Sequence, residues 1–134
     1  MEQQEQEALL KIARSAAGNA YSVYSGFSVG AAVLLENGEI VRGSNQENAA
    51  YPSGMCAERV ALFYACSAYP GVRVRAVAIA ARDASGAWAP SVTPCGACRE
   101  VMAGVIRRYG ADFDVLTGER VVRASELLPF PFAP

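Results

Sequence analysis

Three cysteines and one glutamate are the residues of this chain best suited to chemistry. They stand in two short motifs, Cys56-Ala57-Glu58 and Pro94-Cys95-Gly96-Ala97-Cys98. Two cysteines three residues apart at the start of a helix lie on one face, so Cys95 and Cys98 can chelate a single ion. Cys56 adds a third thiolate if the fold brings the two motifs together. The motifs therefore predict a metal site.

Three protein ligands leave the fourth position of a tetrahedral zinc ion open, which is typical of catalytic zinc. We predict one Zn²⁺ per chain. Cys66 lies ten residues beyond Cys56, roughly 15 Å along the same predicted helix, and we expect it in the core. Glu58 can reach the open position without binding the metal, so we expect it to transfer protons. Arg59 and Arg99 are candidates to hydrogen-bond to the sulfurs and offset the charge of three thiolates.

The elements that must position these residues follow from periodicity and turn signals. Helical spacing covers 7–17, 56–68 and 96–109. Strands are expected over 27–35 and 40–44, joined by the turn dipeptide Asn37-Gly38, and over 73–81, 113–116 and 120–122. This order predicts one α/β domain over residues 1–134, with a mixed sheet covered by helices.

The lengths of these elements bring the two motifs together. The helix after Cys56 is roughly 20 Å long and the following strand roughly 23 Å. A chain that runs down this helix and returns along this strand brings the start of the next helix, at Cys95, to the same edge of the sheet as the start of the first, at Cys56. Helix N-termini also stabilise thiolates, which favours metal binding there.

Composition narrows the function. Twelve Lys and Arg against thirteen Asp and Glu give a net charge of −1, which disfavours nucleic acid as a partner. A hydrophobic fraction of 52% and a mean hydropathy of +0.16 are high for a small monomer and suggest a homo-oligomer. The chain has no histidine, which excludes Ser-His-Asp and Cys-His catalysis.

The start of the chain carries no sign of export or membrane insertion. Residues 1–10 are polar and acidic, and no apolar run is long enough to span a bilayer. We therefore expect no membrane partner and a cytoplasmic location, in which the four cysteines stay out of disulfides.

Several blocks of the sequence resemble the small, homotetrameric cytidine deaminases of the three-cysteine zinc branch. The resemblance covers nearly the whole chain and implies a three-layer α/β/α fold with a five-stranded mixed sheet. It rests on Cys56-Ala57-Glu58-Arg59 and Pro94-Cys95-Gly96-Ala97-Cys98-Arg99, on residues 24–32 (YSGFSVGAA) and 45–51 (NQENAAY), and on Leu127-Leu128-Pro129.

The resemblance implies hydrolytic deamination of cytidine and deoxycytidine to uridine and deoxyuridine, with release of ammonia, in pyrimidine salvage. It makes Glu58 the proton-transfer group. Asn45 and Glu47 would bind the ribose 3′-hydroxyl, and Phe27 would pack on the pyrimidine ring.

It also implies contacts by the backbone and across subunits. The N–H of Ala57 would bind the ring 2-carbonyl, and Ala49 would touch base or sugar through its backbone. Tyr51 and Phe132 would reach sites across subunit interfaces.

Simpler interpretations stand beside these. The cysteines could be buried thiols, Glu58 a surface acid at a helix start, and Asn45 and Glu47 loop caps. Arg59 could form a solvated ion pair, and Phe130 and Phe132 could cover the core of their own domain. Rival functions are deamination of another cytosine nucleoside such as a blasticidin-type antibiotic, nucleic-acid editing, and a non-catalytic zinc module.

Overall fold

The computed structural model describes all 134 residues, which build one five-stranded sheet between helices. Its helices are α1 (Gln3–Ala16), α2 (Ala57–Ala68) and α3 (Gly96–Tyr109), and its strands are β1 (Ser28–Leu35), β2 (Ile40–Ser44), β3 (Val74–Arg82), β4 (Asp114–Leu116) and β5 (Val121–Arg123), with short 3₁₀ turns η1 (Ala17–Asn19), η2 (Tyr51–Ser53) and η3 (Ala124–Leu127). The predicted elements are all present. The first helix begins four residues earlier than predicted, because a capping box formed by Glu2 and Glu5 starts it.

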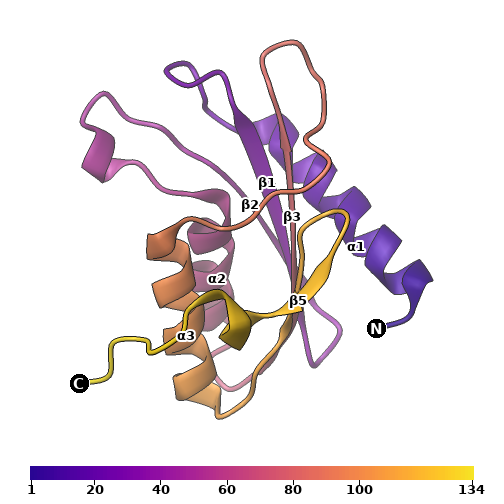
Figure 1. Ribbon diagram of the computed structural model, residues 1–134, viewed down its shortest axis with the longest axis vertical. Coiled ribbons are helices and arrows are strands. Elements are labelled where there is room, and N and C mark those ends of the chain that lie inside the picture. The colour runs from indigo at the N-terminus through magenta and orange to yellow at the C-terminus, as the bar shows by residue number, and fades with distance from the viewer.

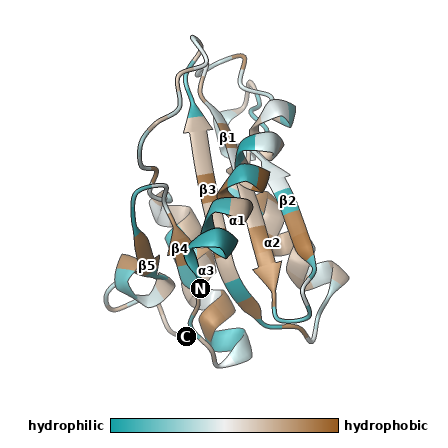
Figure 2. Cartoon of the chain, turned by 90° about the vertical axis from the view of Figure 1, so that its right-hand side faces the viewer, coloured by the Kyte–Doolittle hydropathy of each residue, from teal (hydrophilic) through white to brown (hydrophobic).

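The strand order is β2-β1-β3-β4-β5, and only β3 and β4 run parallel. A parallel pair needs a crossover connection, and α3 supplies it. As Figures 1 and 2 show, α1 lies on one face of the sheet while α2 and α3 lie on the other. The expected three-layer α/β/α arrangement is confirmed.

The core is divided between the two faces of the sheet. The larger cluster lies beneath α2 and α3 and includes Leu62, Ile79, Met102 and Phe113. The smaller one packs under α1 and consists of small and medium side chains, such as Leu9 and Leu116. Buried apolar area on both faces fixes the helices on the sheet and with them the positions of the two motifs. No helix is both long and apolar enough to cross a bilayer.

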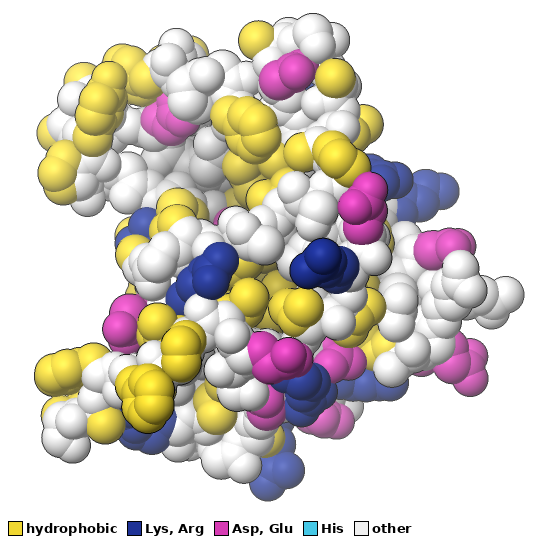
Figure 3. All heavy atoms as spheres, in the orientation of Figure 1, with side chains coloured by type: hydrophobic (Ala, Val, Ile, Leu, Met, Phe, Trp, Pro, Cys, Tyr) yellow, Lys and Arg dark blue, Asp and Glu magenta, His cyan; other side chains and the backbone are white.

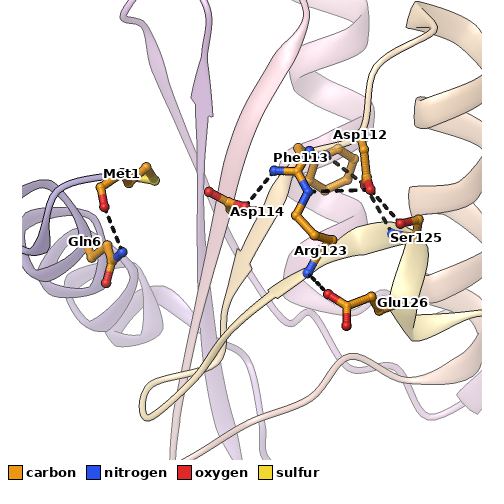
Figure 4. A network of polar contacts seen from close by, with 8 residues as sticks. All are labelled: Met1, Gln6, Asp112, Phe113, Asp114, Arg123, Ser125 and Glu126. Carbon is orange, nitrogen blue, oxygen red and sulfur yellow. Dashed lines mark hydrogen bonds and ion pairs between the residues drawn. The ribbon is translucent and has the colours of Figure 1, made fainter.

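A polar network holds the last strand and the turn after it (Figure 4). Arg123 pairs with Asp114 at 2.7 Å and with Asp112 at 3.5 Å. Asp112 also accepts hydrogen bonds from the hydroxyl and N–H of Ser125, at 2.5 and 3.1 Å. The network ties β5 and η3 to β4 and to the segment before it, and so fixes where the C-terminal segment leaves the domain.

Candidate active site

The three cysteines predicted as ligands meet between the starts of α2 and α3. Cys56 is the N-cap residue of α2 and Cys95 that of α3. The Sγ atoms of Cys56 and Cys95 lie 3.6 Å apart, and those of Cys95 and Cys98 lie 3.4 Å apart. All three sulfurs are within 4.8 Å of one another. The fold thus joins two motifs that are 39 residues apart.

The sulfur positions fit a zinc ion. Tetrahedral zinc with Zn–S bonds of about 2.3 Å holds its sulfurs about 3.8 Å apart, close to the observed separations. Cys66, the remaining cysteine, is buried in the core and is not part of this group. The chain therefore offers three thiolate ligands and leaves one coordination position for a small molecule.

The environment favours a thiolate at Cys56. A hydrogen bond from the Cys98 thiol, with the Arg59 guanidinium, lowers the pKa of Cys56 to about 5. Arg59 Nη2 lies 3.4 Å from Cys56 Sγ. The pKa of Cys98 is raised, because its thiol donates to Cys56 and is buried. A metal ion displaces the remaining thiol protons when it binds.

Glu58 lies next to this group in the first turn of α2. Glu58 is only 4% exposed, although an acidic residue at a helix start usually faces water. Burial raises the pKa of its carboxyl group. Ala57 is fully buried, and its N–H belongs to the first turn, where N–H groups have no partner within the helix. An acid that can exchange protons and a free donor thus stand beside the cysteines.

Asn45 and Glu47 follow the end of β2. Asn45 is 9% exposed, and in its side chain Oδ1 accepts the N–H of Val29 and Nδ2 donates to the carbonyl of Phe27, both at 2.9 Å. One N–H of the amide stays free. Glu47 accepts N–H bonds from Tyr24 and Ser25, each at 3.0 Å, and the Ser25 hydroxyl. These bonds lower the pKa of Glu47, with the Ser25 hydroxyl contributing most.

A cavity of about 430 Å³ connects Glu47 with Cys56. This volume is within the range of small-molecule sites. Its lining comes from the loop before β1, the segment after β2 and the start of α2, and consists of Tyr24, Ser25, Asn45, Gln46, Glu47, Asn48, Tyr51, Gly54, Met55, Cys56 and Arg59. Asn45 and Glu47, predicted to bind the sugar, thus share one cavity with Cys56, one of the three predicted metal ligands.

Four other predicted contact residues are accessible. Phe27, immediately before β1, is 39% exposed, and Tyr51 and Phe132 are about three-quarters exposed, at 74% and 73%. Ala49 is also exposed. Hydrophobic side chains gather over the loop between β2 and α2 and near the C-terminus (Figure 3, upper and lower left). Phe130, at 101%, and Phe132 do not cover the core of their own domain.

The expectation that Arg99 bonds to a sulfur is not met. Its Nε donates to the carbonyl of Pro94 at 2.8 Å and its Nη1 to the carbonyl of Leu127 at 2.9 Å. The side chain bonds to the backbone before α3 and in η3 rather than to a thiol. Arg99 therefore holds the C-terminal segment against the start of α3.

Sequence reasoning gave no role to Ser25. Its signal was present, since Ser25 stands in the Tyr24-to-Ala32 block that carries the family resemblance. Contacts with Glu47, 22 residues away, were not readable from that block.

Comparison with known proteins decides the family. The family model described as the cytidine and deoxycytidylate deaminase zinc-binding region matches residues 3–108. The chain belongs to this deaminase family. Like the family model, it holds a zinc-binding region, and the three converging thiols supply it. The chain is therefore an enzyme of the deaminase family.

Named relatives agree with this deaminase assignment. The chain is 43% identical over 133 residues to a cytidine deaminase of Halalkalibacterium halodurans, covering 96% of this chain and 94% of the relative. The crystal structure of a cytidine deaminase from Burkholderia pseudomallei matches with a TM-score of 0.81 at 39% identity, covering 98% of this chain and all of the other. A cytidine deaminase from Mycobacterium tuberculosis matches with a TM-score of 0.75 at 35% identity, over 96% and 97% of the two chains.

Proposed function

We propose that this protein hydrolyses cytidine and deoxycytidine to uridine and deoxyuridine and releases ammonia. The observation that carries the proposal is the convergence of three thiols beside the buried carboxyl group of Glu58, at one end of a cavity that also holds Asn45 and Glu47. The names of the relatives point to the same substrate. Residues 1–134 would act as one unit.

Cys56, Cys95 and Cys98 would hold the zinc ion. A zinc ion held there would supply an activated water as the nucleophile for hydrolysis at neutral pH. Glu58 then has the proton-transfer role. Its carboxylate would take one proton from the attacking water and give it to ring N3. It would then take the second proton from the hydroxyl group formed at C4 and give it to the leaving amino group, so that water and cytidine become uridine and ammonia. Its burial keeps bulk water from competing for that proton.

Arg59 supports the ligand set. Its guanidinium lies on the Cys56 sulfur and offsets part of the negative charge of three thiolates. A less negative ligand set leaves the metal a stronger Lewis acid.

Asn45 and Glu47 can bind one sugar hydroxyl together, Asn45 as a hydrogen-bond donor and Glu47 as an acceptor. The free N–H of Asn45 donates to the hydroxyl oxygen. A carboxylate offers about four acceptor positions, of which three are used in Glu47, so one remains to accept the hydroxyl proton. A nucleoside without the 3′-hydroxyl leaves both groups unpaired and binds more weakly.

The base would lie between Phe27 and the start of α2. The exposed ring of Phe27 offers an apolar surface for the pyrimidine. The N–H of Ala57 would donate to the 2-carbonyl oxygen of the ring, which places the amino-bearing carbon toward the thiols.

We further propose that the protein assembles as a homotetramer and works in pyrimidine salvage in the cytoplasm. The exposed aromatic residues Phe63 and Tyr64 on α2 support self-association, because isolated monomers rarely expose such groups together. Tyr51 and Phe132 would then reach sites across subunit interfaces, whereas Ala49 would touch base or sugar through its backbone. The four free cysteines suit a reducing compartment. Light scattering at several concentrations tests the assembly.

The test of the function is ultraviolet absorbance of the protein mixed in turn with cytidine, deoxycytidine, cytosine and CMP. The wild-type protein is compared with Glu58→Gln, and bound zinc is measured in both. We expect loss of the cytidine and deoxycytidine bands with the wild type. We expect the variant to retain about one zinc per chain and to lose at least about a hundredfold in kcat.

Consumption of cytosine but not of nucleosides would contradict the roles of Asn45 and Glu47. Zinc binding without turnover of any of the four compounds would contradict the proposed reaction. Full activity of Glu58→Gln would contradict its proton-transfer role.

A further inference from the structure

The hydroxyl group of Ser25 joins two residues that would bind opposite halves of the substrate. Its Oγ donates to Oε2 of Glu47 at 2.5 Å and accepts the N–H of Phe27 at 3.0 Å. The backbone N–H of Ser25 donates to the other oxygen of the same carboxylate, at 3.0 Å. One side chain thus connects the sugar-binding carboxylate with the residue expected beneath the base.

The loop around Ser25 is shaped for this contact. Gly26 has a φ of +72° and donates its N–H to the carbonyl of Ser22 at 2.8 Å, so the chain reverses there. Only a residue without a Cβ adopts this left-handed conformation at little cost. The reversal brings the N–H of Phe27 back to the hydroxyl of Ser25 while that hydroxyl points at Glu47.

Oε2 of Glu47 accepts a hydrogen bond from the Ser25 hydroxyl, whereas Oε1 accepts two backbone N–H groups, those of Tyr24 and Ser25. Without the hydroxyl, Oε1 stays anchored and Oε2 can turn about it. The oxygen that is then free to turn is the one that the Ser25 hydroxyl, itself bonded to the N–H of Phe27, had fixed.

We infer that Ser25 is a positioning residue that holds the Glu47 carboxylate at a fixed place relative to Phe27 and so sets how strictly the site demands a sugar 3′-hydroxyl. The inference rests on the proposed function. Ser25 does not itself have to touch the nucleoside, since its proton is given to Glu47 and it receives the N–H of Phe27.

The test compares kcat and KM on two nucleosides, deoxycytidine and 2′,3′-dideoxycytidine, which differ only in the 3′-hydroxyl. Where turnover of the dideoxy compound is slow, its Ki against deoxycytidine replaces its KM. For Ser25→Ala we expect KM for deoxycytidine to rise about tenfold or more, as for a lost hydrogen bond to a charged group. Binding of dideoxycytidine should change less than about twofold, so the preference for the 3′-hydroxyl falls.

Matched variants separate this role from a structural one. Ser25→Thr keeps a hydroxyl and should retain the preference for the 3′-hydroxyl. Ser25→Val, which has the shape of the threonine variant but no hydroxyl, should lose that preference. This pair of variants carries the test if Ser25→Ala folds poorly. Ser22→Ala is the loop control, because the Ser22 hydroxyl bonds to Ser28 at 2.9 Å and does not reach Glu47. In a Glu47→Ala background, Ser25→Ala should add nothing.

Equal losses on both nucleosides, or equal behaviour of the Thr and Val variants, would overturn the inference about Ser25. Absence of wild-type turnover on deoxycytidine would instead overturn the proposed function.

Discussion

The backbone of Gly43 on β2 lies directly against that of Ala57 on α2, so closely that a Cβ at position 43 would stand 2.6 Å from the carbonyl oxygen of Ala57. The same Cβ would come within 2.8 Å of the N atom of Ala61. Both neighbours are backbone atoms, which cannot move aside alone. Since Ala57 stands between Cys56 and Glu58, Gly43 sets how deeply the start of α2 sits on the sheet.

Gly43→Ala should lower both stability and activity. Overpacking a closed contact of this kind costs about 1–3 kcal/mol, and the shift of α2 would move Cys56 relative to Cys95. Urea unfolding and zinc content measure the two effects. Gly104→Ala is the control, because a Cβ there meets nothing within 4 Å and alanine suits a helix interior. Equal stability of the two variants would contradict the contact.

Zinc binding should depend on three of the four cysteines. Alanine at Cys56, Cys95 or Cys98 should reduce bound zinc well below one per chain, because two thiols hold the ion weakly. Cys66→Ala should keep its zinc and lose some stability, since Cys66 is buried in the core. Metal analysis by atomic absorption, with urea unfolding, gives both quantities. Loss of zinc from the Cys66 variant would contradict the assignment of Cys66 to the core and indicate that it contributes to metal binding.

Removal of the metal should destabilise the whole chain. Zinc binds the folded protein and not the separated motifs, so a chelator removes the stabilisation that binding supplies. We expect Tm to fall on treatment with a chelator and to return when zinc is added back. A Tm that does not respond, in protein shown to have lost its zinc, would mean that the thiols are held together by the fold alone.

Arg99→Met should loosen the C-terminal segment without removing zinc. Two carbonyls, of Pro94 and Leu127, would lose a charged donor, at a cost of about 1.5–3 kcal/mol for each bond. Limited proteolysis should then cut near the C-terminus sooner than in the wild type. Arg107→Met is the matched control, since Arg107 bonds only to the carbonyl of the exposed Phe132, at 2.9 Å. Faster cleavage of Arg107→Met than of Arg99→Met would mean that Arg107, and not Arg99, is the main residue holding the C-terminal segment.

The KM for cytidine should stay constant as the pH falls from 7 to about 5. The pKa of Glu47 is lowered from 4.5 by the Ser25 hydroxyl and by the N–H groups around it. A carboxyl group with a lowered pKa stays ionised above that pKa and loses its charge only as the pH falls through it. In Ser25→Ala the rise in KM should therefore begin at a higher pH. If the wild-type KM rises severalfold before the pH has fallen to about 5, Glu47 is not ionised as proposed.

The local elements were predictable because each carries its own signal. The Asn37-Gly38 turn fixed the β1–β2 hairpin, and Gly110, in the left-handed conformation with a φ of +66°, ends α3 as a glycine after a helix usually does. The meeting of Cys56 with Cys95 was also predictable, since it follows from the lengths of one helix and one strand.

Contacts between side chains and distant backbone were not predictable. Arg99 stands beside Cys98 in the sequence, which suggested a bond to sulfur, but the carbonyl it reaches belongs to Leu127, 28 residues away. The Ser25–Glu47 bond likewise depends on how two loops face each other after the sheet has formed. Such partners are set by tertiary packing and leave no periodic pattern in the chain.

The spacing of the ligands also orders events during synthesis. Cys56 leaves the ribosome 39 residues ahead of Cys95, an interval of about 2–8 s at about 5–20 residues per second. During that time its thiol has no partner with which to hold a metal. The three sulfurs can come together only after β1, β2, α2 and β3 have been synthesised, so the nascent chain completes its zinc site late.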